Sequence, residues 1–160
     1  MKVRTRQSSS RVTVDPEGVL DHYQRELAAL YAEFSAASGE TARKGAAERI
    51  CERVSAQCDM EDEILYPEAA RLAARPDNRI RAAQMEGAFV RKIVAQIRSL
   101  PYDDRRLAGT LDVLKDYVAD YLEQQRSDVL PRLRQGTRTA VLAETMLQRR
   151  AQNPGAAASR

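Results

Sequence analysis

The residues with the clearest capacity for chemistry lie between Gln57 and Pro67, and Glu61 is the central one. One helical face, in which residues recur at spacings of three and four, comprises Ile50, Val54, Gln57, Glu61, Ile64 and Leu65. This face is apolar at both ends, but its middle carries an amide and a carboxylate. An ionised carboxylate on a buried face is costly unless it is paired, hydrogen-bonded or bound to a metal ion. We therefore expect other groups to contact Glu61.

A second segment repeats this pattern later in the chain. Its apolar face comprises Leu111, Leu114, Val118, Tyr121, Gln125 and Val129, and Pro131 follows it as Pro67 follows the first. At the offset between the two prolines (131 minus 67, or 64 residues), Gln57 corresponds to Tyr121 and Glu61 to Gln125. The two segments therefore predict two helical hairpins of similar design, each with polar residues at the same depth.

Other reactive residue types give weaker signals. His22 is the only histidine, and beside Asp21 it is more typical of a surface histidine than of a metal ligand. Cys51 and Cys58 lie about 10 Å apart along one predicted helix, which is beyond disulfide reach and favours reduced thiols. Nucleophile–base pairs, phosphate loops and zinc spacings are missing from the sequence. A non-enzymatic protein is therefore the expectation.

Helical periodicity accounts for most of the chain, and no sustained strand alternation interrupts it. The breaks at Gly39, Pro76, Pro101 and Pro131 predict helices over about 15–38, 41–75, 79–100 and 104–131, with a kink at Pro67 in the second. A fifth helical segment is expected over about 137–150. The sequence thus predicts an all-α protein: an antiparallel up-down-up-down four-helix bundle at 15–135, with a disordered basic arm at 1–14 and a C-terminal helix and frayed tail at 136–160.

Composition narrows the class of protein. The 160 residues include 31% charged and 43% hydrophobic residues, which is typical of one soluble globular domain. The 26 basic residues exceed the 23 acidic ones only slightly, and the surplus lies in the tails, so we expect no nucleic-acid partner. No apolar run approaches the ~20 residues of a membrane span, and no secretory leader is evident. We expect a cytoplasmic protein without a membrane partner. The sequence is also compatible with a homo-oligomer.

The chain resembles the hemerythrin-like family of HHE cation-binding domains over roughly residues 15–135. The resemblance rests on Asp21-His22 in the first helix and on polar positions followed by Ile-Leu-Tyr-Pro at 64–67 and by Val-Leu-Pro at 129–131. It implies a four-helix bundle around a non-haem di-iron centre. The family's ligands are a histidine on each of helices one and three and a His-x-x-x-Glu pair on each of helices two and four.

On this sequence, the resemblance puts those ligand positions at Gln57 and Glu61, at Tyr121 and Gln125, and at Gly87. The helix-one position is His22 if the Asp-His dipeptide sets the register, and Tyr23 if the apolar face sets it. Only His22 and Glu61 retain ligand types of the family. We therefore expect no ordinary di-iron centre and most simply no cofactor, with iron as the alternative.

Three hypotheses describe the function. In the first, a degenerate hemerythrin-like domain acts as a non-enzymatic binding, sensory or structural module, in which Glu61 is hydrogen-bonded to Tyr121 and Gln125. The polar layer of Tyr23, Gln57, Glu61, Gly87, Tyr121 and Gln125 then stabilises the fold or holds a small ligand. In the second, an altered ligand set that includes Glu61 and Tyr121, with Tyr23 or His22, binds iron and handles oxygen, nitric oxide or iron. In the third, the tails or the fifth segment bind a partner or a second copy.

Overall fold

The computed structural model describes residues 14–134, 136 and 138–152, and this part of the chain is all-α, without a strand. Its elements are α1 (Pro16–Ala36), α2 (Glu40–Met60), the π-helical turn η1 (Glu61–Leu65), α3 (Tyr66–Leu72), α4 (Asn78–Ser99), α5 (Arg106–Asp128), α6 (Leu130–Leu133) and α7 (Thr139–Gln152). The predicted all-α class is confirmed. No helix in the described ranges is long and apolar enough to cross a membrane.

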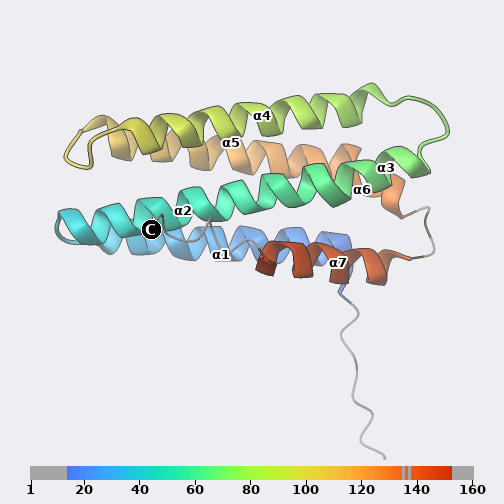
Figure 1. Cartoon of the computed structure of the whole chain (residues 1–160), viewed down its shortest axis with the longest axis horizontal. Coiled ribbons are helices and arrows are strands. Elements are labelled where there is room, and N and C mark those ends of the chain that lie inside the picture. Colours follow the sequence, from blue (N-terminus) through green and yellow to red (C-terminus); the bar gives the residue numbers. More distant parts are fainter. Residues whose placement is uncertain (1–13, 135, 137, 153–160) are drawn as a thin grey trace, which may run out of the picture.

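The four long helices form two helix pairs, α1/α2 and α4/α5, which lie side by side (Figure 1). Apolar residues at three-and-four spacing line the space between them, as the sequence predicts. The fully buried side chains include Leu20 and Tyr23 of α1, Ile50 of α2, Val90 of α4, and Leu111 and Leu114 of α5. Burial of each of these large side chains stabilises the fold by about 1.5 to 3 kcal/mol.

Local signals set most helix boundaries. Asp15 caps α1, because its carboxylate accepts a hydrogen bond from the Gly18 N–H at 2.8 Å, and Pro16 occupies the first helical position. Asp77 caps α4 in the same way. Gly39 has a φ of 91°, which an L side chain rarely adopts, and it lies in the turn directly before α2.

The helix that contains Pro67 has a widened turn just before the proline, where the sequence predicts a kink. In η1 the Tyr66 N–H bonds to the carbonyl of Glu61, five residues back rather than four. Pro67 has no N–H and its ring clashes with the carbonyl four residues earlier, so a wider turn at this point lets the chain stay helical. The continuation ends at Leu72, a few residues short of the predicted position near 75.

The fifth segment docks against the α1/α2 pair, on the side away from α4 and α5 (Figure 1). Arg150 of α7 bonds to Glu26 of α1, and its guanidinium lies 5.4 Å from the centre of the Tyr23 ring. Arg149 bonds to Glu63 of η1 through both carboxylate oxygens. Two apolar side chains of α7 are fully buried beneath it, Ala143 and Met146.

Two parts of the predicted domain plan lie outside the described residues. The basic arm at 1–14 is described only at Val14, and the tail beyond Gln152 is not described. The disorder predicted for these segments stays a prediction.

Candidate functional site

Glu61 is completely buried in the interior of the four long helices, with 0% of its surface exposed. Its Oε1 accepts a hydrogen bond from Gln57 Nε2 at 2.6 Å, one helical turn earlier. Its Oε2 accepts a hydrogen bond from the Tyr121 hydroxyl, which reaches across from α5. Both carboxylate oxygens are thus satisfied by side chains of the chain itself.

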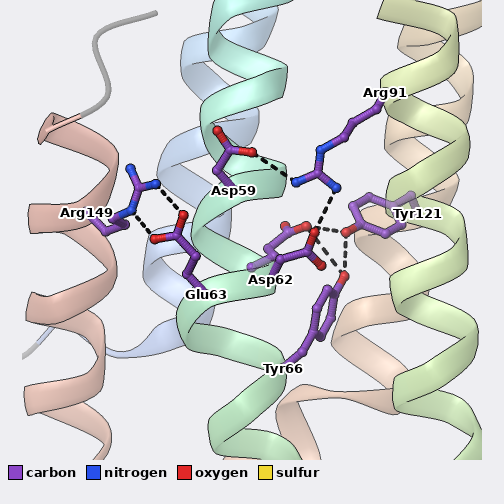
Figure 2. Close-up of polar contacts among 8 residues, drawn as sticks. Asp59, Asp62, Glu63, Tyr66, Arg91, Tyr121 and Arg149 are labelled. Atoms are coloured by element: carbon purple, nitrogen blue, oxygen red, sulfur yellow. Dashed lines mark hydrogen bonds and ion pairs between the residues drawn. The ribbon is translucent and has the colours of Figure 1, made fainter. Parts of the chain in front are cut away.

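Tyr66 completes this cluster, although the helical periodicity of the sequence does not predict it. Its hydroxyl lies 2.5 Å from that of Tyr121 (Figure 2). It also accepts a hydrogen bond from Gln125 Nε2 at 2.9 Å. Tyr66 comes five residues after Glu61, a spacing that an α-helix does not bring to one face. The π-helical turn inserts one extra residue and rotates the subsequent residues by about 100°, which brings Tyr66 to the side of Glu61.

We call these five side chains the carboxyl network: Gln57, Glu61, Tyr66, Tyr121 and Gln125. Its hydrogen bonds have one consistent direction. A phenol donates only one hydrogen, and that of Tyr121 goes to Glu61, so the Tyr66 hydroxyl donates to Tyr121. Gln125 donates to Tyr66, and not directly to Glu61 as the first hypothesis expects. The chain of donors therefore ends on the Glu61 carboxylate, an arrangement suited to the ionised acid.

The same geometry also accommodates a neutral Glu61. The Tyr66 hydroxyl lies 3.4 Å from the carbonyl oxygen of Ala83. If the acid is protonated and donates to Tyr121, then Tyr121 donates to Tyr66 and Tyr66 to Ala83. Each hydroxyl reverses direction, and no donor loses its acceptor. The network can therefore hold the carboxyl in both protonation states.

Burial dominates the electrostatics of the site. It raises the pKa of Glu61 from 4.5 to about 7, although the hydrogen bonds from Tyr121 and Gln57 and the nearby amide of Gln125 oppose this change. Burial and the neighbouring Glu61 carboxylate also raise the pKa of Tyr66 and of Tyr121 above 10. The two phenols therefore remain neutral donors at ordinary pH.

Two amide oxygens in the network have no hydrogen-bond partner among the described protein groups. They are Oε1 of Gln57 and Oε1 of Gln125, on residues that are at most 1% exposed. An unpartnered buried carbonyl costs about 1 to 3 kcal/mol. The network thus satisfies its carboxyl group completely and its two amides only in part.

Charged residues flank the network near the surface. Arg91 of α4 donates to Asp59 at 3.0 Å and to Asp62 at 2.8 Å, and so ties α4 to α2 and η1 (Figure 2). Each of these three side chains is about one-third exposed, so water screens the ion pairs. The acidic run that begins at Glu61 is therefore split, because Glu61 points inward while its neighbours pair with arginines at the surface.

Of the other predicted site residues, Tyr23 and Gly87 are buried and His22 is exposed. Tyr23 is buried at 1% exposure, whereas the His22 side chain is 53% exposed and lies 3.4 Å from Glu26. The apolar face, rather than the Asp-His dipeptide, therefore sets the register of α1. Gly87 is buried opposite Tyr121, and a Cβ atom there would lie 3.5 Å from the Tyr121 hydroxyl, an ordinary contact.

The candidate set His22 and Glu61 is not assembled in this structure, because His22 faces outward and Glu61 inward. In the described part of the chain, no three or more His, Cys, Asp and Glu side chains gather in a way that could hold a metal ion. A cleft of about 820 Å³ lies between α3 and α7, and no member of the carboxyl network lines it. The network is closed to solvent.

Comparison with models of protein families, with curated proteins and with solved structures gives no significant match to this chain.

Proposed function

We propose that the chain is a degenerate hemerythrin-like domain, an antiparallel four-helix bundle that serves as a non-enzymatic binding, sensory or structural module. In this proposal the carboxyl network takes the place that a di-iron centre has in that family. The observation that carries the proposal is the satisfied and fully buried carboxylate of Glu61, which accepts hydrogen bonds from Gln57 and Tyr121.

The chemistry of the donors supports this proposal. A di-iron centre of the resembled kind needs several imidazole nitrogens and two carboxylates. The groups that converge at Glu61 are one carboxylate, two phenols and two amides, and the single imidazole of the chain is on the outer side of α1. These residues do not fit that centre.

The test uses the stability of the protein as a binding assay. A ligand that binds only the folded state raises the free energy of unfolding, by about 2.7 kcal/mol at a free concentration of 100 times its Kd. The proposal predicts equal unfolding midpoints with a chelator and with ferrous or ferric iron added. A midpoint that rises with iron in the wild type but not in the Glu61→Gln variant would contradict it.

A second candidate function is iron binding through oxygen ligands. It is favoured by one observation, the convergence of Glu61 Oε2 with the hydroxyls of Tyr66 and Tyr121. Carboxylate and phenolate oxygens suit ferric iron, but the raised pKa values of both tyrosines oppose phenolate formation. This function predicts a coloured ferric–phenolate complex that the Tyr121→Phe variant lacks. Absence of any such band in iron-loaded wild-type protein would exclude it.

A further inference from the structure

The outer surfaces of the two helix pairs differ. α7 covers the outer side of α1/α2, where it buries Ala143 and Met146 (Figure 1). On α4/α5, three large apolar side chains are exposed instead: Met85 by 60%, Phe89 by 50% and Val113 by 57%. Exposed large apolar groups that gather on one face of a soluble protein mark an interaction site.

These side chains belong to one patch. Met85, Phe89 and Ile93 follow one another at four-residue spacing along α4, and Val113 and Tyr117 do so along α5. The Tyr117 hydroxyl donates to Glu86, so these flanks of the two helices lie next to each other on the outer side of the pair. We call Met85, Phe89, Ile93, Val113 and Tyr117 the α4/α5 patch.

Opposite charges border the patch on its two sides. α4 carries five basic residues and one acidic one, whereas α5 carries three basic residues and five acidic ones. Arg91 and Arg98 of α4 turn toward α2, with which they form ion pairs. Arg81 and Lys92 remain exposed on α4, and Asp116 and Asp120 on α5, and none of the four forms an ion pair with another described residue.

We infer that the α4/α5 patch binds the same patch of a second copy of this chain, around a two-fold axis that runs parallel to the helices between α4 and α5. This rotation places the basic α4 of each copy over the acidic α5 of the other. A two-fold interface must be complementary to itself, and a surface that is basic on one side and acidic on the other meets this condition. The inference does not depend on whether the interior binds iron.

The contact between Glu86 and Tyr117 fixes which residues meet. α4 and α5 run in opposite directions, so Phe89, three residues after Glu86, is level with Leu114, three residues before Tyr117. The Lys92 ammonium lies over the Phe89 ring, 5.2 Å from its centre, and is therefore level with the turn of α5 from Val113 to Asp116. Because the two-fold axis is parallel to the helices, the rotation does not change the position of any residue along the helix direction. Lys92 of one copy therefore meets Asp116 of the other, beside the apolar contact made by Val113. Both contacts occur twice in the dimer.

Sedimentation equilibrium over a range of protein and salt concentrations tests this dimer. We expect reversible dimers of the wild type that weaken as salt screens the border charges. Val113→Glu should lower the association constant at least about tenfold, because it buries an unpaired carboxylate in the apolar contact. The matched control is Val141→Glu on α7. This valine is about equally exposed, at 58%, but it lies outside the α4/α5 patch, beside the cleft between α3 and α7. The control should change association by less than about twofold.

The charge pairing has its own test. Lys92→Glu and Asp116→Lys should each weaken the dimer several-fold, and the double variant should recover most of the loss because the ion pair is restored with exchanged partners. A wild type that stays monomeric up to its solubility limit would overturn the inference. Equal effects of Val113→Glu and Val141→Glu, or a double variant weaker than both single ones, would also overturn it.

Discussion

A carboxyl group without exposed surface must be neutral or must be solvated by the protein, and the surroundings of Glu61 provide for both states. In the ionised state it accepts hydrogen bonds from Gln57 and Tyr121. In the neutral state the hydroxyls of Tyr121 and Tyr66 reverse direction, toward the carbonyl of Ala83. Burial nevertheless favours the neutral form, and this preference makes Glu61 the residue through which pH acts on the fold.

The first prediction concerns the pH dependence of stability. The pKa of Glu61 is about 7 in the folded state and near its ordinary value of 4.5 in the unfolded state, so the folded state binds more protons between these values. The free energy of unfolding therefore falls by about 3 kcal/mol from Glu61 alone as pH rises through this window, and no further above it. Chemical denaturation near pH 5 and near pH 8 should show that Glu61→Gln removes this loss.

The matched control is Glu63→Gln at the other face of the same turn. Arg149 holds the pKa of Glu63 below its ordinary value, so the contribution of Glu63 to stability is present above pH 4.5 and is lost as pH falls. The two variants should therefore deviate from the wild type in opposite pH directions. Identical pH profiles for Glu61→Gln and wild type would contradict the burial of an ionisable group at this position.

The second prediction concerns the phenols. Tyr121→Phe removes the donor to Glu61 Oε2 and the acceptor of Tyr66, and it should cost about 1 to 3 kcal/mol of unfolding free energy at neutral pH. Tyr117→Phe, one turn earlier on α5, removes a hydroxyl bonded to Glu86 near the surface and should cost less than about 0.5 kcal/mol. Urea denaturation of both variants measures the difference. Equal costs would mean that the network does not stabilise the fold.

Most of the site residues could be predicted from the sequence, but their complete arrangement could not. The positions of Gln57, Glu61, Tyr121 and Gln125 on inner faces follow from helical periodicity, and the structure buries all four. Tyr66 was missed because its place depends on a π-helical turn, which the periodicity of an ordinary helix does not contain. The Tyr66-Pro67 sequence was the available signal, since a proline inside a helix requires some change in the preceding turn.

At the level of elements, α7 was the least predictable part of the fold. Its helical character follows from the spacing of Leu142, Met146 and Leu147, but a short amphipathic segment does not specify which surface it covers. The structure places it against α1/α2, where Arg150 pairs with Glu26 of α1 and Arg149 with Glu63 of the adjoining η1 turn. The ends of the other helices differ from expectation by a few residues, because capping tolerates such shifts.

The third prediction separates the two arginines that hold α7. Arg150 is 4% exposed and lies against the ring of Tyr23, so Arg150→Ala removes packing, a cation–π contact and the bond to Glu26. It should cost about 1 to 2 kcal/mol of unfolding free energy. Arg149→Ala removes only an ion pair at the surface and should cost less than about 1 kcal/mol, with the cost reduced by salt. A larger cost for Arg149→Ala would show that α7 is held differently.

For the whole molecule, the two helix pairs play different roles although α2 and α5 share a pattern of apolar and polar positions at an offset of 64 residues. The α1/α2 pair is covered by α7, and the η1 turn that continues α2 supplies Glu61; the α4/α5 pair supplies Tyr121 and leaves its outer patch exposed. The interior was therefore easier to predict than the exterior. Apolar periodicity predicts which helix faces are buried. It does not predict whether another element of the chain or a second copy covers an outer surface.

We propose that hydrogen bonds between side chains occupy the place of a metal centre in this domain. The most direct measurement is the metal content and absorption spectrum of the full chain purified from an iron-supplemented culture. We expect iron far below one equivalent per chain and no band from an oxo-bridged or phenolate-bound ferric ion. A pair of irons per chain with an oxo-bridged spectrum would contradict it.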